Sequence, residues 1–241
     1  MATVAEDLAP TGVLRVSINL GNPVLAQGTA QAPRGVTVDI AREVARRLGL
    51  PVEWVCFDAA RKSYEALTTG RADLGFLAIE PARAAEVAFT APYVVIEGVF
   101  AVPRDSALRT VEDVDARGVR IGVKEGSAYD LYLTRTLQRA TVVRGAEGAE
   151  AFRAEGLEVA AGIRQPITRY VAENPELRLI DERFMEIRQA VAMALSKRPE
   201  TVAYLYDVIE DLKASGFVAS SLTRSGQPDA TVAPPARPEM R

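Results

Sequence analysis

The sequence predicts an α/β fold in two lobes, each a mostly parallel sheet flanked by helices. Strand-length apolar runs alternate with segments of helical period in two successive series, and an extended apolar segment follows each series. Such alternation favours right-handed crossovers, with ligands bound at the carboxyl ends of the strands. We predict lobe 1 at residues 1–98 and 189–222, lobe 2 at 99–188, and a disordered C-terminal tail at 223–241.

The first series predicts the core of lobe 1. Strands are expected at 14–18, 52–57 and 73–77, and helices at 35–48 and 63–69. Gly49 and Pro51 end the first of these helices, because neither residue continues a helix well. The extended segments 94–102 and 185–195 are expected to be the two hinge strands that leave and re-enter lobe 1.

The second series predicts lobe 2. Strands are expected at 119–123, 141–143, 157–160 and 177–180, and helices at 110–115, 127–137, 146–153 and 166–173. An amphipathic helix at 199–214, closed by Gly216, returns to lobe 1. From Thr223 onward the chain lacks large hydrophobic residues, which is why a disordered tail is predicted there.

The composition excludes several classes of function. With 48% hydrophobic and 25% charged residues and a net charge of −3, the 241-residue chain is typical of soluble globular proteins and is not expected to bind nucleic acid. It contains no histidine, which excludes Ser-His and Cys-His catalysis and histidine metal sites. The single Cys56 is expected to be buried in a strand. No phosphate-binding glycine motif is present, and no cofactor or metal is expected.

The N-terminal residues MATVAEDLAPTGVLRV have neither a basic region nor an apolar core of the kind found in secretory signals. No apolar run approaches the roughly 20 residues that a membrane-spanning helix needs. Either a signal has been removed, or the protein works in the cytoplasm.

Residues 70–93, GRADLGFLAIEPARAAEVAFTAPY, are the most informative segment. An apolar strand is followed by Pro81, which suits the first position of a helix, and then by Arg83. Free N–H groups at a helix start and a guanidinium together can bind a carboxylate. The segment therefore predicts a carboxylate clamp.

This segment resembles the signature of the family 3 solute-binding proteins, two-lobed receptors that deliver amino acids and similar solutes to ABC transporters. Matching residues occur in the family's order and spacing: Gly70, Arg71, Asp73, Ile79, Pro81, Arg83, Phe89, Thr90, Pro92 and Tyr93. Two positions depart from the pattern, Ala78 in place of a serine and Glu80 in place of a threonine. The resemblance covers roughly residues 12–216 and implies a periplasmic-binding-protein fold of type II that closes over its ligand.

The resemblance also implies ligand contacts in lobe 2. In the family, a Gly-Thr or Gly-Ser pair begins a helix whose N–H groups and hydroxyl hold the ligand carboxylate, and Gly126, Ser127 and Ala128 match that place. Glycine allows close approach of the backbone to an anion, and serine is a good N-cap. Tyr129 and Asn22 are further candidates for lining the site.

One family position is reversed in charge. Amino-acid binders carry an aspartate for the ligand's ammonium group where this chain has Arg164. Three interpretations stay open. Glu80 could take the ammonium group, with Arg164 facing a second acidic group of the ligand. Arg83 and Arg164 could bind the two anionic groups of an organic acid. Finally, Glu80 and Arg164 could form an ion pair with each other.

The resemblance implies a monomeric, non-enzymatic substrate-binding protein of the periplasm that binds a small carboxylate-bearing solute between its lobes and hands it to a transporter permease. One alternative is an enzyme similar to cyclohexadienyl or arogenate dehydratases, in which Glu80 would be a general acid. Another is a cytoplasmic ligand-sensing or non-binding homologue.

Overall fold

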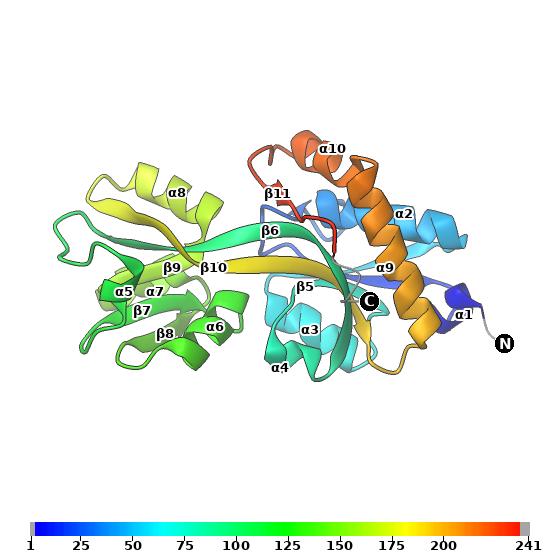
Figure 1. The fold of residues 1–241 in the computed structure, drawn as a ribbon, viewed down its shortest axis with the longest axis horizontal. Helices are drawn as coiled ribbons and strands as arrows, with labels where there is room; N and C mark the ends of the chain where they lie inside the picture. The colour runs from blue at the N-terminus through cyan, green and yellow to red at the C-terminus, as the bar shows by residue number, and fades with distance from the viewer. Residues whose placement is uncertain (1–2, 237–241) are drawn as a thin grey trace. The chain divides into compact units, whose positions relative to one another are not determined.

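The computed structural model describes residues 3–236. The chain divides into two compact units, unit 1 with residues 1–95 and 188–241 and unit 2 with residues 96–187 (Figure 1). Two long strands, β6 (Val87–Pro103) and β10 (Leu177–Ala194), contribute residues to both units. They include the predicted hinge segments 94–102 and most of 185–195 but are far longer than predicted.

Unit 1 contains a mixed sheet. In its parallel part, β1 (Leu14–Asn19) lies between β4 (Val52–Phe57) and β5 (Leu74–Ala78), and the last part of β10 pairs antiparallel with β5. The connections are α2 (Val36–Leu48) and α3 (Ala60–Thr68), both of which contact β1. The three predicted strands and two predicted helices of this unit are confirmed within a few residues at their ends.

The other helices in the described part of unit 1 are α1 (Val4–Leu8), α4 (Pro81–Ala84), α9 (Pro199–Ala214) and α10 (Phe217–Arg224). The predicted helix 199–214 is confirmed, and Gly216 has the left-handed conformation, with φ 77°, that glycine adopts most readily. The sequence did not predict α1 or α10, or the short hairpin of β2 (Gln27–Gly28) and β3 (Pro33–Arg34).

The prediction of a disordered tail at 223–241 is wrong for residues 223–236, and residues 237–241 lie outside the described part. Strand β11 (Thr231–Val232) pairs antiparallel with β6, and the Ala233 N–H donates to the Tyr93 carbonyl at 3.0 Å. Ala230 and Ala233 are buried. Backbone pairing and small buried side chains need no large hydrophobic residues, so the composition hid this segment.

Unit 2 repeats the same design. Strand β7 (Arg120–Lys124) lies between β8 (Thr141–Gly145) and β9 (Val159–Ile163), all parallel, and β6 pairs antiparallel with β9. The helices are α5 (Val111–Val114), α6 (Ala128–Thr136), α7 (Gly148–Glu155) and α8 (Arg164–Glu173). A side chain at Gly148 would meet the Ala161 carbonyl at 2.6 Å, so glycine allows α7 to pack directly on the sheet.

In each unit, an ion pair lies at the amino ends of the parallel strands. In unit 1, Arg15 bonds the carboxylate of Asp73 at 2.6 Å, and in unit 2 Arg120 bonds Glu158 at 2.8 Å. The Asp73 carboxylate also accepts the Arg15 N–H at 3.0 Å. Asp73 of the signature segment therefore has a structural role at the edge opposite to the carboxyl ends of the strands.

Candidate functional site

The carboxyl ends of the parallel strands of unit 1 bring together most of the candidate residues of that unit. Ala78 ends β5 and is buried opposite Gln189 of β10. Asn22 follows β1, is buried, and accepts the Val24 N–H on its side-chain oxygen at 3.3 Å. The Asn22 side chain is therefore used, at least in part, to shape its own loop.

Glu80 and Arg83 lie in the turn that follows β5, as predicted. Glu80 is the N-cap of the single-turn helix α4 (Pro81–Ala84), with Pro81 at a first helical position, and both charged side chains are about 3% exposed. The guanidinium of Arg83 donates to the Ala78 carbonyl at 3.3 Å. Because α4 is one turn long, the group here that attracts an anion is the guanidinium rather than a helix dipole.

Arg83 is a desolvated cation in an acidic neighbourhood. Burial lowers the pKa of Arg83 to about 10, while the charge of the Glu80 carboxylate acts in the opposite direction. The nearby Tyr64 is hydrogen-bonded to Glu86, and burial raises its pKa. This corner of unit 1 therefore offers a cation and carboxylates within electrostatic reach of one another.

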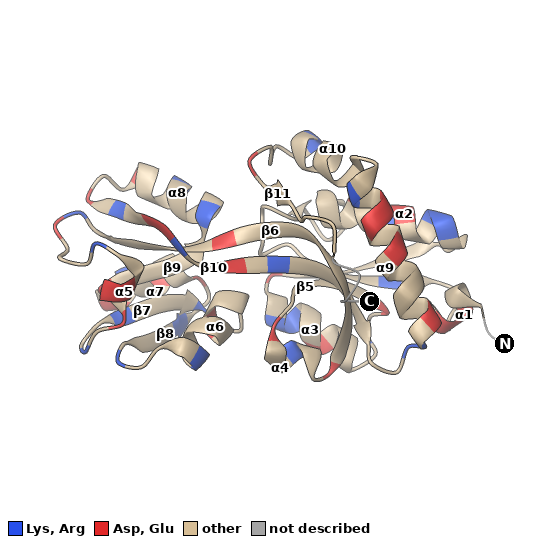
Figure 2. Ribbon diagram, viewed as in Figure 1, with Lys and Arg blue, Asp and Glu red and all other residues tan. Residues whose placement is uncertain are grey.

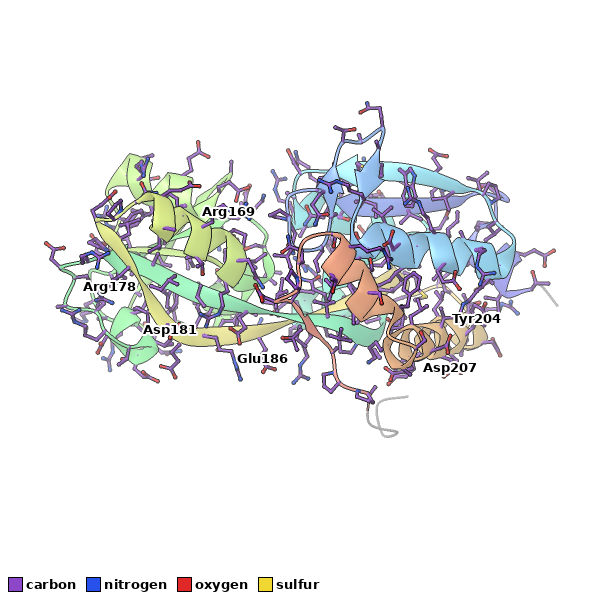
Figure 3. All side chains as sticks on the ribbon, turned by 90° about the horizontal axis from the view of Figure 1, so that it is seen from above. Arg169, Arg178, Asp181, Glu186, Tyr204 and Asp207 are labelled. Atoms are coloured by element: carbon purple, nitrogen blue, oxygen red, sulfur yellow. The ribbon has the colours of Figure 1, made fainter. Side chains whose placement is uncertain are left out.

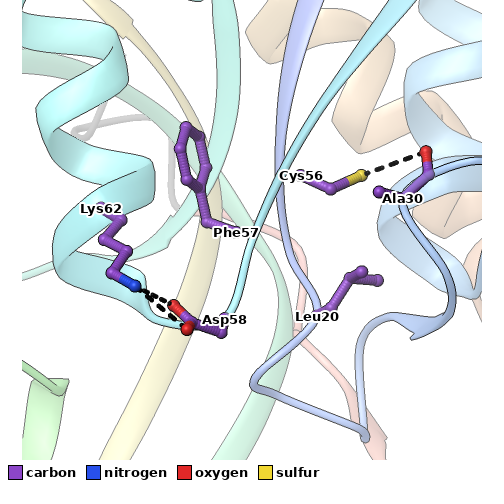
Figure 4. A pocket seen from close by; sticks show the side chains of 6 residues that line it. All are labelled: Leu20, Ala30, Cys56, Phe57, Asp58 and Lys62. Carbon is purple, nitrogen blue, oxygen red and sulfur yellow. Dashed lines mark hydrogen bonds and ion pairs between the residues drawn. The ribbon is translucent and has the colours of Figure 1, made fainter.

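A hollow of about 260 Å³ lies at the same edge of unit 1 (Figure 4). It is lined by Leu20, Ala30, Cys56, Phe57, Asp58 and Lys62. The sequence predicted a buried Cys56, whereas the structure leaves it half-buried on this wall, because β4 is an edge strand of its sheet. Burial raises the pKa of the Cys56 thiol, which disfavours the reactive thiolate.

In unit 2, Gly126 to Tyr129 form the start of α6 as predicted. Ser127 is the N-cap, and its hydroxyl accepts the Asp130 N–H at 3.1 Å. Gly126 has φ 67°, and its N–H donates to the Asp130 carboxylate at 2.8 Å. Ser127, Ala128 and Tyr129 are all buried. The helix start has the predicted form, and one of its N–H groups is satisfied by the protein's own carboxylate.

Two residues that the sequence did not single out lie near the start of α6. Lys124 ends β7 and forms an ion pair with Glu147, which precedes α7. The buried Tyr129 hydroxyl is hydrogen-bonded to the Ser127 side chain and to the Lys124 backbone. Burial, with the charge of Glu147, raises the pKa of Tyr129. The sequence could have indicated Lys124 and Glu147 as candidates, because each follows a predicted strand, and ligands bind at the carboxyl ends of such strands.

Arg164 begins α8 at the carboxyl end of β9, on the same edge as Lys124, but its guanidinium is held within unit 2. It donates to Glu97 at 2.5 Å, to the Asp181 carboxylate at 3.2 Å and to the Asp181 carbonyl at 2.7 Å. All three interpretations of the sequence directed this side chain at a ligand or at Glu80. The difference arises because β6 and β10 bring carboxylates to the start of α8.

Glu97 is shared between two arginines. Arg183 of β10 donates to its second oxygen at 3.1 Å, and Arg183 also pairs with Glu186 at 3.0 Å. Charged residues mark both β6 and β10 in Figure 2, and Figure 3 labels Asp181 and Glu186 on β10. A connected set of ion pairs therefore links five residues of unit 2: Glu97, Arg164, Asp181, Arg183 and Glu186.

Across residues 3–236, no group of three acidic, cysteine or histidine side chains is placed to hold a metal ion. Over the same described span, none of the helices is long and apolar enough to span a membrane.

Comparison with known structures identifies the fold. The solute receptor for L-cysteine of Neisseria gonorrhoeae matches with a TM-score of 0.78 and 21% identity, covering 97% of this chain and 100% of that one. The cysteine-binding protein of Campylobacter jejuni matches with a TM-score of 0.75 and 20% identity, covering 93% of each chain. The ancestral amino acid-binding protein AncCDT-1, a precursor of cyclohexadienyl dehydratase, matches with a TM-score of 0.72 and 21% identity, covering 92% of this chain and 99% of that one.

These likenesses confirm the predicted α/β fold of the type II periplasmic binding proteins. A search of curated proteins gives no match. The model of the bacterial extracellular solute-binding proteins, family 3, matches residues 14–224. The chain therefore belongs to the bacterial extracellular solute-binding proteins of family 3.

Proposed function

We propose that this protein is the substrate-binding component of an ABC transporter and binds a small carboxylate-bearing solute, with Arg83 as the carboxylate clamp. The observation that carries the proposal is the buried guanidinium of Arg83 at the carboxyl end of β5. A desolvated guanidinium gains most from a bidentate carboxylate, because little water competes for its donors. Ser127 and the start of α6 supply the donors of unit 2.

Of the two ligand classes, amino acids fit the charges better than simple organic acids. Glu80 stands close enough to Arg83 to influence its pKa, so a ligand with both a carboxylate and an ammonium group matches this corner. The second cation needed by the organic-acid interpretation, Arg164, already faces Glu97 and Asp181. Glu80 is therefore our candidate for the ammonium partner.

Calorimetry against a panel of amino acids, dicarboxylates and keto acids tests the proposal. Arg83→Ala is expected to weaken carboxylate binding by at least about 100-fold, because a charge-assisted hydrogen bond contributes about 1.5–3 kcal/mol and a bidentate clamp makes two. Arg71→Ala is the matched control, since this arginine of the same segment is exposed and pairs with Glu65 at 3.2 Å. Equal affinities for wild type and Arg83→Ala would exclude the clamp.

Glu80→Gln separates the ligand classes. It is expected to weaken binding of α-amino acids while leaving the corresponding keto acids little changed, because only the amino acids carry an ammonium group. The reverse pattern would assign the site to organic acids and remove Glu80 from ammonium recognition.

An enzymatic role is the second candidate. The buried Glu80 beside Arg83 could act as a general acid on a cyclic carboxylate, and the similar AncCDT-1 is described as a precursor of cyclohexadienyl dehydratase. We favour binding without catalysis because the family is one of solute-binding proteins. Turnover of prephenate or arogenate, lost in Glu80→Gln, would establish the enzyme instead.

The proposal extends to partners and compartment. The family's extracellular members imply a periplasmic location, a permease partner and a monomeric receptor. Cell fractionation and light scattering of the purified protein test the compartment and the oligomeric state. Recovery in the cytoplasm would instead favour a ligand-sensing role.

A further inference from the structure

Three arginines of unit 2 lie on the edge of its sheet opposite to the predicted ligand contacts. Arg104 directly follows β6, Arg178 lies at the start of β10 (Figure 3), and Arg109 lies just before α5. Because β6 pairs antiparallel with β9, with Ala101 opposite Ala160, the end of β6 lies at the amino ends of the parallel strands. We call Arg104, Arg109 and Arg178 the arginine cluster.

Two members of the arginine cluster are held by hydrogen bonds to the backbone. Arg104 donates from Nε to the Pro175 carbonyl at 2.7 Å and from Nη2 to the Leu177 carbonyl at 3.3 Å. Arg178 donates from Nε and Nη2 to three carbonyls of the facing segment, at 3.3, 3.1 and 2.5 Å: those of Arg104, Ser106 and Leu108. Within the described part of the chain, Nη1 of neither side chain makes a hydrogen bond. Both guanidinium groups are therefore fixed and keep N–H donors for a further acceptor.

No carboxylate pairs with the arginine cluster. Across residues 3–236, none of its three side chains forms an ion pair. Glu158 lies at the same edge of the sheet, but it is paired with Arg120 at 2.8 Å. Asp105 and Glu176 are neighbours in the sequence, but both are exposed, so water and salt screen their charges. The positive charge of the cluster is thus left without a close counter-charge.

The three cations also act on one another. Burial lowers the pKa of Arg178, and the charges of Arg109 and Arg104 lower it further. Like charges that lie close together repel, and an anion between them turns this repulsion into attraction. The Arg109 side chain is exposed and makes no hydrogen bond in the described structure, so it can turn toward such an anion.

This arrangement favours a small oxyanion over an extended acidic surface. Because backbone hydrogen bonds already hold Arg104 and Arg178, little conformational entropy is lost when they bind. The planar fork of a guanidinium matches the spacing of oxygens in a phosphate or sulfate group. An extended acidic partner would also meet the exposed carboxylates of Asp105 and Glu176, which repel it.

We propose that the arginine cluster is an accessory binding site for a tetrahedral oxyanion, a phosphate or sulfate group. The anion accepts hydrogen bonds from the free N–H groups of Arg104 and Arg178, and Arg109 supplies the third positive charge. Bound there, it links residues 104–109 to the start of β10 and stabilises this edge of unit 2. The site uses none of the residues of the proposed solute site and does not depend on the proposed function.

Calorimetry of the full chain with sodium phosphate and sodium sulfate, in a buffer without other oxyanions, tests the proposal. Wild type is expected to show saturable binding that sodium chloride at the same ionic strength does not reproduce. Arg109→Gln is expected to weaken this binding by about 10-fold or more, because it removes a charge-assisted hydrogen bond. Arg117→Gln is the matched control and is expected to bind as wild type does, since Arg117 is an exposed arginine of the same unit outside the cluster.

A second variant and a second assay complete the test. Arg178→Lys keeps the charge but loses the planar fork, so it is also expected to weaken binding. Thermal melts show whether it folds, and Arg109→Gln decides alone if it does not. Sedimentation with phosphatidylglycerol vesicles, with phosphatidylcholine vesicles as the control, identifies the source of the phosphate group. Sedimentation that Arg109→Gln reduces assigns a lipid headgroup, whereas calorimetric binding without sedimentation assigns a free anion.

The results that would overturn the proposal are equally distinct. They are the absence of binding to both anions and to the vesicles, or equal affinities of wild type and Arg109→Gln. Loss of phosphate binding in Arg83→Ala would place the anion at the carboxylate clamp and overturn the proposal as well. A protein that binds phosphate through the cluster but binds no amino acid or organic acid would keep this site and lose the proposed function, so the two proposals fail independently.

Discussion

Replacing Arg164 tests whether this residue stabilises the folded protein or binds a ligand. In the structure it donates to Glu97 at 2.5 Å and to the carboxylate and carbonyl of Asp181 at 3.2 and 2.7 Å. Arg164→Ala is therefore expected to lower the free energy of unfolding and to leave the affinity for a carboxylate ligand within about threefold of wild type, a difference of roughly 0.6 kcal/mol.

The size of the effect follows from exposure. The side chains of Arg164 and Glu97 are 29% and 31% exposed, so their charge-assisted contact is worth about 1–1.5 kcal/mol. The Asp181 carboxylate is 97% exposed and adds a few tenths of a kcal/mol at most, and the carbonyl contact adds about 0.5 kcal/mol. The total is about 2 kcal/mol, which corresponds to a decrease in Tm of roughly 4–8 °C for a chain of this size.

Urea denaturation followed by circular dichroism measures the loss, and a double-mutant cycle with Glu97→Gln isolates the pair, with an expected coupling of about 1 kcal/mol. Arg183→Ala is the matched control, because it contacts the same carboxylate at 3.1 Å but is half-exposed, so a loss of about 0.5 kcal/mol is expected. Arg164→Asp should be less stable than Arg164→Ala, since it adds a carboxylate near Glu97 and Asp181. Wild-type stability of Arg164→Ala together with a tenfold loss of ligand affinity would refute this account and make Arg164 a ligand residue.

Three further changes test other features. Gly148→Ala is expected to lower the free energy of unfolding by about 1–3 kcal/mol, because the added Cβ would lie 2.6 Å from the Ala161 carbonyl oxygen. Urea denaturation measures this loss, and a variant as stable as wild type would show that α7 can move away from the sheet. Glu43→Gln is expected to cost about 1 kcal/mol at pH 7 and nothing near pH 2. Hydrogen bonds from Arg46 and Arg47 lower the pKa of Glu43 from 4.5 to about 2. The stabilisation by the Glu43 carboxylate is therefore complete above pH 4.5 and is lost as the pH falls toward 2. A difference in unfolding free energy between wild type and Glu43→Gln that stays the same at low pH would contradict this. Deletion of residues 231–241 removes the pairing of β11 with β6. It is expected to lower the free energy of unfolding by about 1–2 kcal/mol and to speed hydrogen exchange at Val94 and Val95. Unchanged exchange would mean that this pairing does not stabilise β6.

The sequence predicted the elements of the fold because their signals are local. Apolar periodicity located the strands 14–18 and 52–57 and the helix 199–214. Pro81 and Ser127 act within one helical turn of their own positions, so the starts of α4 and α6 could be predicted from neighbouring residues. The lengths of β6 and β10 could not be predicted in this way. Pro92 interrupts the first part of β6, and the charged residues 181–183 interrupt β10, so neither stretch has the local pattern of a strand.

Only the tertiary structure determined how charged side chains of the candidate site are paired. Arg164 meets Glu97 across 67 residues of sequence, and Lys124 meets Glu147 across 23. By itself the sequence determined the family signature, the two α/β series and the place of Arg83 after β5. Which carboxylate neutralises which cation depends on how strands far apart in the sequence are brought together, and Coulomb attraction acts on that distance in space rather than on separation along the chain.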